Sequence, residues 1–211
     1  FLKFVNKKKV DLLRINMSHV SLRQLPKIIT FVRKYTKIPL CIDTEGAQIR
    51  TKTKKKFFFK TFNIFKIKKV KGLFNLYPVE IFDILKKGDI LDIGFTGLEV
   101  KIISKNEKYL KCKVVRGGYF ENNKGVHLKN RKLKIDYLTK KDFQAISIAR
   151  KFKIKNYALS FTNTQHDVLN FNRLLKKENK IFKLETKTAL KNLNQILRLG
   201  KNFLIDRGDL S

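Results

Sequence analysis

The sequence predicts a parallel α/β fold that is interrupted by a small all-β module, and three observations support this prediction. Short apolar strands alternate with helical patterns at both ends of the chain, as in sheets built from βα units. Charged or polar residues stand at the carboxyl ends of these strands. Between the two βα parts the helical pattern disappears and short alternating runs take over. The pattern leaves open whether the parallel sheet closes into a barrel.

The first predicted strand begins near Val10 and becomes polar towards its end. Arg14, Asn16 and Ser18 alternate there, so an extended backbone would place all three side chains on one face. A barrel interior usually carries branched apolar residues at such positions. Three polar side chains in register therefore indicate ligand binding, with a solvent-facing edge strand as the alternative.

Ser21 is expected to cap a helix over residues 22–35, whose apolar positions recur every three or four residues. A second strand follows from Ile38 and ends at Asp43, so an acid stands at its carboxyl end. Ligands bind at that end of the strands in parallel α/β folds and in (β/α)₈ barrels.

Residues 51–131 are expected to form the inserted antiparallel module, with 1–50 and 132–211 as the two parts of the parallel domain. The evidence is a set of alternating apolar runs separated by glycines. The approach to the module, residues 52–69, is rich in lysine and phenylalanine, and we expect it to be a mobile loop.

After the module the βα pattern resumes. Thr139 is expected to cap a helix, Tyr157 to begin a strand, and residues 167–177 to form the next helix. Beyond the following strand, a helix is expected over 186–199 and a further strand over 202–205.

Residues 181–185 are predicted to form a short buried strand on which Lys183 and Glu185 point to the same face. Asp209 follows the next strand. A lysine and two acids that converge at strand ends indicate an anionic substrate held through a hard divalent cation. Mg²⁺ suits this role because it takes one or two protein carboxylates and binds phosphate. The alternative is a structural ion pair of Lys183 with Glu185 or Asp209.

The formal net charge of +32 suggests a nucleic-acid partner. Of the 49 basic residues, however, only 10 are arginine, the residue that base and phosphate recognition favours. The basic residues are also spread along the whole chain. The one dense cluster, 52–69, interleaves lysine with phenylalanine and keeps single-stranded nucleic acid as a minor alternative to a solvated basic loop.

Cys41 and Cys112 are isolated, which indicates neither a disulfide framework nor a zinc site. No apolar run approaches the length of about 20 residues that a membrane span needs, and no signal sequence is visible. We therefore expect a soluble, cytoplasmic protein. The chain begins at Phe1 and stops at Ser211, where a helix should open. This indicates an internal fragment of a longer protein, and we expect the fragment alone to be inactive.

Five segments stand in order along the chain: RINMSH (14–19), DTEGAQIRT (43–51), KGVHL (124–128), FKLE (182–185) and RGDL (207–210). Together they resemble the pyruvate kinase family in order and spacing. The resemblance covers nearly the whole chain. It implies a (β/α)₈ barrel, incomplete in this fragment, that is interrupted by a β lid domain.

The resemblance also implies roles for individual residues. Lys183 and Arg14 match the residues that act on the transferring phosphoryl group and the enolate, and Glu185 and Asp209 match the ligands of Mg²⁺ or Mn²⁺. The monovalent-cation residues, usually for K⁺, match Asn16, Ser18, Asp43 and Thr44. The nucleotide-binding residues match Asn16, His19, Arg50 and Lys124. Substrate binding matches Arg14, Lys183, Gly208 and Asp209.

The chain departs from the family pattern beside Asp43. Glu45, Ala47 and Gln48 stand where the family usually has Lys, Pro and Glu. The acid replaced by Gln48 goes with K⁺ dependence, so this departure puts the K⁺ requirement in question. Asn163 likewise replaces a basic residue.

The resemblance implies transfer of phosphate from phosphoenolpyruvate to ADP, giving pyruvate and ATP, in a full-length protein that forms a homo-oligomer. The alternative is a catalytically inactive paralogue that acts as a binding or regulatory module. The retained set Arg14, Lys183, Glu185 and Asp209 favours the enzyme, whereas the altered loop at Glu45 favours the paralogue.

Overall fold

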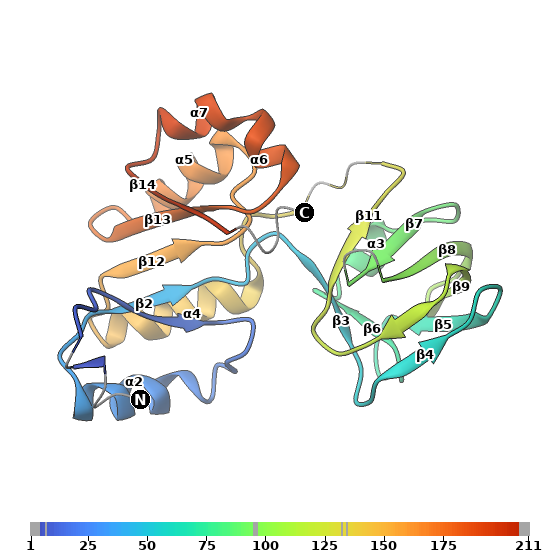
Figure 1. Cartoon of the computed structure of the whole chain (residues 1–211), viewed down its shortest axis with the longest axis horizontal. Coiled ribbons are helices and arrows are strands. Elements are labelled where there is room, and N and C mark those ends of the chain that lie inside the picture. The colour runs from blue at the N-terminus through green and yellow to red at the C-terminus, as the bar shows by residue number, and fades with distance from the viewer. Residues whose placement is uncertain (1–4, 7, 95–96, 132, 134, 207–211) are drawn as a thin grey trace. The chain divides into compact units, whose positions relative to one another are not determined.

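The computed structural model describes residues 5–6, 8–94, 97–131, 133 and 135–206. The chain divides into two compact units (Figure 1). Phe1–Ala47 and Asp136–Ser211 form one, the parallel-sheet unit, and Gln48–Ile135 form the other, the β unit. The sequence places the inserted module at 51–131, and the domain bounds of the whole protein remain a prediction.

The parallel-sheet unit contains a five-stranded sheet in which every neighbouring pair is parallel. The strands lie side by side in the order in which they occur along the chain, as expected for consecutive βα units (Figure 1). They are β1 (Leu13–Asn16), β2 (Leu40–Asp43), β12 (Asn156–Leu159), β13 (Asn179–Leu184) and β14 (Asn202–Ile205).

Helices follow these strands along the chain. They are α2 (Leu25–Tyr35), α4 (Lys140–Lys151), α5 (Gln165–Leu174), α6 (Lys187–Lys191) and α7 (Leu193–Leu197). As predicted, Thr139 caps α4, and Asp142 completes a capping box with it. A second capping box, of Thr164 with Asp167, starts α5 two residues before the predicted position.

The helix predicted over 167–177 covers Gln165–Leu174, and two other helix predictions were also wrong in their extent. The helix predicted over 22–35 begins at Leu25, because Ser21 and Gln24 form a turn instead. In this turn Ser21 N donates to Gln24 Oε1 at 3.0 Å and Gln24 N to Ser21 Oγ at 3.3 Å. The helix predicted over 186–199 is split at Asn192, whose side-chain amide donates to the carbonyl of Asn163 at 2.8 Å.

A continuous apolar core joins these helices to the sheet. Leu25 and Ile29 from α2, Ala145 from α4 and Phe171 from α5 are fully or nearly fully buried in it. Phe182 on β13 packs edge-on against Phe171, with ring centroids 6.0 Å apart. The core therefore fixes the strands whose carboxyl ends carry the predicted site.

The β unit consists of a seven-stranded antiparallel sheet, in the order β5-β9-β8-β7-β11-β3-β6, and a two-stranded ribbon of β10 and β4. The short helix α3 (Ile81–Ile84) precedes β7. The strands are β3 (Ile49–Lys52), β4 (Phe57–Phe59), β5 (Ile64–Lys68), β6 (Asn75–Tyr77), β7 (Ile90–Ile93), β8 (Leu98–Lys105), β9 (Tyr109–Arg116), β10 (Gly118–Phe120) and β11 (Gly125–Leu128). The antiparallel pairing follows from the alternating runs in the sequence.

The lysine- and phenylalanine-rich stretch is not the predicted mobile loop, because it forms β4 and β5. Phe59 stacks on Phe65 with ring centroids 4.2 Å apart, and Phe74 and Phe120 complete the aromatic cluster. Only alternate residues face this core, so Phe58 remains 57% exposed. Phe59, Phe65, Phe74 and Phe120 thus pack against one another, whereas Phe58 and Phe62 remain exposed.

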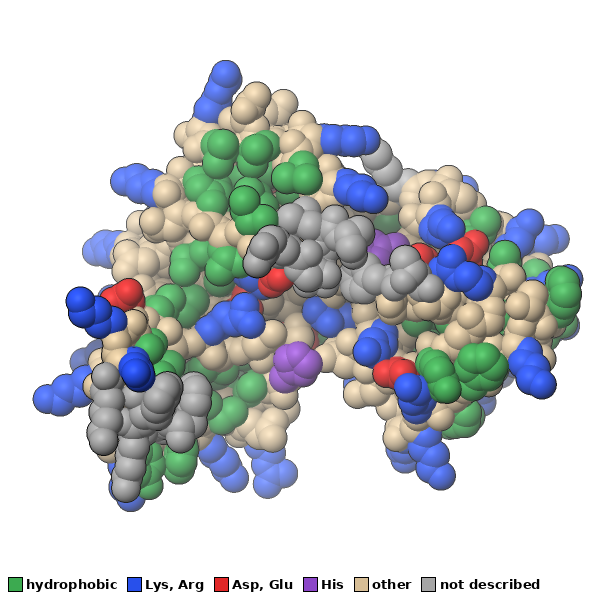
Figure 2. Space-filling model, in the orientation of Figure 1, with side chains coloured by type: hydrophobic (Ala, Val, Ile, Leu, Met, Phe, Trp, Pro, Cys, Tyr) green, Lys and Arg blue, Asp and Glu red, His purple; other side chains and the backbone are tan. Residues whose placement is uncertain are grey.

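The basic side chains do not gather into one patch on the face seen in Figure 2 but are scattered over both units. Among the described helices, none combines the length and apolar character needed to cross a membrane. Cys41 and Cys112 are buried free thiols, and burial raises the pKa of each to about 12.

Candidate active site

Lys183, near the end of β13, lies at the centre of a group of polar side chains in the parallel-sheet unit. Its Nζ lies 2.7 Å from Glu185 Oε1, 3.5 Å from Asp43 Oδ2 and 3.8 Å from Asp206 Oδ2. It also donates to Ser160 Oγ at 3.2 Å. These partners stand at or just beyond the carboxyl ends of β2, β12, β13 and β14. One buried ammonium group thus connects four strand ends.

Asp43 extends this group to the first strand. Its Oδ1 accepts a hydrogen bond from Ser160 Oγ at 2.9 Å, and its Oδ2 lies 3.3 Å from Arg14 Nη1. Asp43 is almost completely buried, and Oδ2 has no hydrogen-bond partner among the described residues. Arg14 is half exposed. Its guanidinium is therefore held at one end by the site and remains accessible to a ligand.

Glu185 is the second buried acid beside Lys183. Its Oε2 accepts a hydrogen bond from the backbone N–H of Phe161 at 2.6 Å. Phe161 has a φ of 53°, an unusual value for a residue with a side chain, and this turns its amide towards the carboxylate. Burial raises the pKa of Glu185, although Lys183 and the Phe161 amide act in the opposite direction.

Thr44 lies at the start of the loop after β2 and is buried. Its backbone N–H donates to Ala158 O at 3.0 Å, and its Oγ1 accepts from Ser160 N at 3.1 Å. Both bonds join the end of β2 to the end of β12. Asp43 and Thr44, two of the residues predicted for a monovalent cation, therefore lie where the ends of β2 and β12 meet.

The polar end of β1 differs from the prediction. The strand stops at Asn16, and the next residues form a turn, so Ser18 does not continue the face of Arg14 and Asn16. The Asn16 side chain causes this turn, because its Oδ1 accepts from the backbone N–H of Ser18 at 2.9 Å. His19 lies in the same turn and is exposed.

Two predicted nucleotide-binding residues lie close together within the β unit. Arg50 on β3 is paired in register with Gly125 of β11, the residue after Lys124. Arg50 Nη1 donates to Asn123 O at 3.4 Å, and Lys124 N donates to Thr51 Oγ1 at 2.9 Å. These contacts place two cationic side chains at neighbouring positions of one sheet.

Sequence reasoning missed two members of the site. Ser160 follows an apolar strand, and Asp206 follows β14, which is the same signal that identified Asp43. Gly208 and Asp209, which the sequence predicts as substrate and metal residues, lie outside the described residues.

The model of the pyruvate kinase barrel domain matches residues 1–211. The chain belongs to the pyruvate kinase family. The pyruvate kinase of Staphylococcus epidermidis is 29% identical over 219 residues, which cover 95% of this chain and 37% of that protein. The pyruvate kinase of Thermococcus litoralis is 29% identical and is matched over 99% of this chain and 47% of its own length. The chain thus spans less than half the length of these relatives.

A solved structure supports the same fold. The pyruvate kinase of Cryptosporidium parvum superposes with a TM-score of 0.85 over 99% of this chain and 48% of that chain, at 19% sequence identity. The five parallel strands are accordingly part of a pyruvate kinase barrel domain, and the antiparallel β unit is inserted into it. This confirms the predicted fold class.

The residues of the site fit the cations that pyruvate kinases are expected to use. A divalent ion needs one or two protein carboxylates, and Glu185 provides one, whose Oε1 pairs here with the Lys183 ammonium at 2.7 Å. For a monovalent cation, the buried Asp43 Oδ2 has no hydrogen-bond partner among the described residues, and the Arg14 and Lys183 cations lie 3.3 Å and 3.5 Å from it. The described residues contain no group of three or more His, Cys, Asp or Glu side chains arranged as a metal site, so a bound metal would also need oxygens from the substrate, from water or from Asp209.

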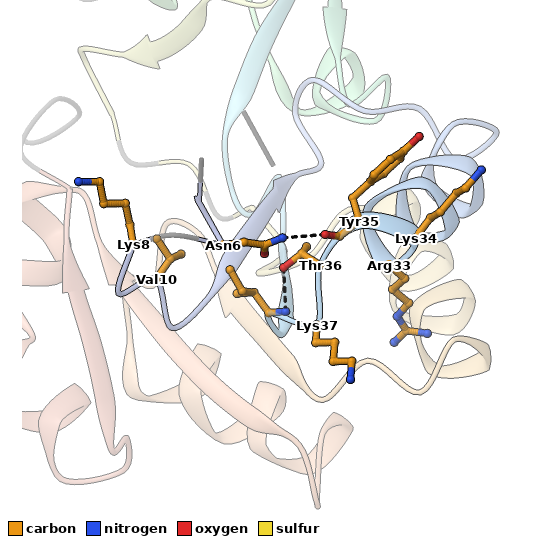
Figure 3. Close-up of a pocket in the computed structure, with 9 residues that line it drawn as sticks. Asn6, Lys8, Val10, Arg33, Lys34, Tyr35, Thr36 and Lys37 are labelled. Carbon is orange, nitrogen blue, oxygen red and sulfur yellow. Dashed lines mark hydrogen bonds between the residues drawn. The ribbon is translucent and has the colours of Figure 1, made fainter. Parts of the chain in front are cut away.

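Two of the surface cavities formed by the described residues lie in the parallel-sheet unit. The larger, about 460 Å³, is lined by Asn6, Val10, Thr36 and neighbouring residues at the amino ends of β1 and β2. Lys8, Lys34 and Lys37 extend from it in different directions, and Asn6 donates to the carbonyl of Tyr35 (Figure 3). Its cations do not converge, and it lies at the end of the strands opposite to the candidate site.

The smaller cavity, about 330 Å³, contains three of the predicted residues. Arg14, Asn16 and His19 line it together with apolar side chains of β1, β2 and α2. The predicted phosphate- and nucleotide-contacting residues of the first strand thus border one hollow beside the edge of the sheet.

Proposed function

We propose that the protein to which this chain belongs is an active pyruvate kinase, which transfers a phosphoryl group between phosphoenolpyruvate and ADP and yields pyruvate and ATP. Membership of the family supports this reaction. The observation that carries the proposal is the buried Lys183 ammonium, which Glu185, Asp43 and Ser160 surround at the carboxyl edge of the parallel sheet. Ligands bind at this edge in (β/α)₈ barrels.

Phosphoryl transfer requires positioning and cations around the equatorial oxygens, because the transition state spreads negative charge over them. Lys183 supplies such a cation from a buried position and also stabilises the enolate oxygen. Arg14 supplies a second one from the half-exposed end of β1, oriented by Asp43 at 3.3 Å. The carboxylates hold both cations in place before substrate binds.

A divalent ion, Mg²⁺ or Mn²⁺, would be held by Glu185 and Asp209, and would neutralise phosphate charge when bound. Asn16, Ser18, Asp43 and Thr44 would hold K⁺. Gln48 has a buried Oε1 without a hydrogen-bond partner among the described residues, and it stands where the family's acid accompanies K⁺.

Asn16, His19, Arg50 and Lys124 would bind the nucleotide. Gly208 would offer its backbone amide to the substrate carboxylate, since a helix N-terminus suits an anion. The same proposal places the full-length protein in the cytoplasm as a homo-oligomer, without a nucleic-acid or membrane partner.

The test is ADP phosphorylation by the full-length protein with phosphoenolpyruvate and Mg²⁺, for wild type and for Lys183→Met. Lys176→Met is the matched control, because Lys176 is exposed at the other end of the sheet, before β13. We expect the control to retain full activity and Lys183→Met to lose nearly all of it. Wild-type activity no higher than that of Lys183→Met would support the inactive paralogue instead.

A further inference from the structure

The loop after β2, which begins at residue 44, carries an ion pair that none of the roles above uses. Lys141, in the first turn of α4, donates to Glu45 Oε1 at 2.7 Å and to the backbone carbonyl of Met17 at 2.5 Å. Thr139 Oγ1 lies 3.2 Å from the other carboxylate oxygen of Glu45. The Glu45 side chain is 7% exposed and that of Lys141 22%. The pair is therefore mostly removed from solvent.

The loop backbone is fixed from the same helix start. Glu45 N donates to Asp142 Oδ1 at 2.7 Å, and Gly46 N donates to Asp142 Oδ2 at 3.2 Å. Asp142 also completes the capping box with Thr139, so one buried carboxylate serves both the helix and the loop. The first turn of α4 thus binds both the Glu45 side chain and the backbone amides of the loop.

Lys141 also joins two strand ends. Met17 O belongs to the turn after Asn16, while Glu45 follows Asp43 and Thr44. The backbone adds one further link, from Met17 N to Asp43 O at 2.9 Å. A single ammonium group therefore bridges the two segments that carry the residues proposed for the monovalent cation.

We propose that Glu45 and Lys141 are positioning residues, whose ion pair holds Asp43 and Thr44 against the end of β1 in the geometry that the reaction needs. This proposal rests on the proposed function for its kinetic consequence. It also accounts for the departure at Glu45. An acid in place of the family's lysine would be a buried uncompensated charge, but here Lys141 neutralises it. The altered loop therefore contains a complete ion pair and is no evidence that the site has lost its function.

For this ion pair we expect the two single substitutions to have unequal effects. Lys141→Met removes the ammonium group that lies 2.7 Å from the buried Glu45 carboxylate, which is costly. Glu45→Gln leaves Lys141 partly exposed and still bonded to Met17 O, which is cheaper. The double variant restores neutrality, so adding Glu45→Gln should rescue Lys141→Met. Residues that act independently would instead show losses that multiply.

The experiment measures kcat and KM for ADP phosphorylation by the full-length protein, with Lys151→Met as the matched control, because Lys151 is exposed at the far end of α4. We expect Lys141→Met to lower kcat by about 10²-fold, as displacement of a site by about 1 Å does. We expect Lys141→Arg and the control to retain kcat, and Glu45→Gln to recover about tenfold in the double variant. The proposal would be overturned by a double variant whose kcat is as low as that of Lys141→Met. It would also be overturned if Lys141→Met changed only KM and left kcat unchanged.

Hydrogen exchange provides a readout that does not need activity. The amides of Glu45 and Gly46 should exchange faster in Lys141→Met than in wild type and slow again in the double variant. An unchanged exchange rate in Lys141→Met would contradict the positioning role. If wild type shows no activity while this exchange pattern is present, the proposed function fails and the ion pair still holds the loop.

Discussion

Lys183 Nζ lies 2.7 Å from Glu185 Oε1, and the two side chains are only 6% and 1% exposed. The residues are two positions apart at the end of β13, so the extended backbone directs both to the same side. Removing one partner would leave the other charge buried without its nearest counter-ion. Substitutions at this pair therefore have to preserve shape while they remove charge.

Glu185→Gln is such a substitution. The amide oxygen can still accept from Phe161 N, so we expect the fold to be kept, but the carboxylate charge that would hold a divalent cation is lost. The rate of ADP phosphorylation should fall by about 10²-fold or more. The Mg²⁺ concentration needed for half-maximal rate should rise. The rate and the half-maximal Mg²⁺ concentration are measured by assaying the full-length protein over a series of Mg²⁺ concentrations.

The control for this substitution is Glu107→Gln, because Glu107 is exposed in the turn between β8 and β9. It should leave the rate and the Mg²⁺ dependence unchanged. A Glu185→Gln protein with the Mg²⁺ dependence of wild type would exclude Glu185 as a ligand.

The pKa of Glu185 predicts how stability changes with pH. Burial raises this pKa above its ordinary value of 4.5, so the folded state binds the proton more tightly than the unfolded state. The stability that this group contributes is present below pH 4.5 and is lost as the pH rises through the folded-state pKa. Relative to Glu185→Gln, wild type should lose free energy of unfolding over that rise. Urea unfolding of both proteins across this pH range measures the two free energies of unfolding, and a free energy of wild type that rises with pH relative to that of Glu185→Gln would contradict the raised pKa.

For Asp89 in the β unit, we expect stability to depend on pH in the opposite direction. Burial alone would raise its pKa, but hydrogen bonds from Arg131 and from Lys86 N outweigh burial and lower the pKa below 3.8. Its contribution is therefore present above pH 3.8 and is lost as the pH falls through the folded-state pKa. Arg131→Met should remove much of this acid dependence and cost about 3 kcal/mol at neutral pH, because Asp89 is buried. Lys69→Met, which breaks an ion pair with Asp83 in which the two side chains are 35% and 60% exposed, should cost less than about 1 kcal/mol in the same unfolding measurements.

Periodicity and strand-end chemistry were sufficient to predict much of this molecule. The alternation of apolar strands and helices gave the parallel sheet, and the acids that follow strands identified Asp43 and Glu185. They did not identify Ser160, because a serine after an apolar strand also occurs in ordinary turns. Its importance arises only when β2 and β13 lie on either side of β12.

The errors arose where side chains compete with the backbone pattern. Asn16 bonds to the amide of Ser18 and ends the strand, although alternation continues in the sequence. Asn192 bonds across to Asn163 and splits a helix whose apolar stripe is unbroken. The Glu45–Lys141 pair spans 96 positions in the sequence, so no local pattern could reveal it. Local signals predict elements, whereas such contacts depend on the assembled fold.

Phe120 tests the aromatic cluster that replaced the predicted mobile loop. It is fully buried, and its ring contacts Phe65 and Phe74. Phe120→Ala should lower the free energy of unfolding of the β unit by about 3–5 kcal/mol. Phe58→Ala removes a ring that is 57% exposed and should cost less than about 1 kcal/mol. Equal losses in chemical unfolding would contradict the division between packed and exposed rings.

Gly46 provides the most local test of the loop after β2. Its φ of +68° favours glycine, and a Cβ at this position would lie 2.3 Å from the backbone oxygen of Ser160. The Ser160 backbone belongs to the end of β12, so it cannot move aside without disturbing the site. Gly88 is the matched control, because it also has a positive φ, +92°, but a Cβ there would meet nothing within 4 Å.

Gly88→Ala should therefore cost only the conformational term, about 1–2 kcal/mol. Gly46→Ala should cost clearly more in chemical unfolding and should also lower the rate of ADP phosphorylation, because Asp43 and Thr44 would move with the loop. Equal stability losses for the two variants, with activity retained in Gly46→Ala, would show that the loop adapts without displacing these residues.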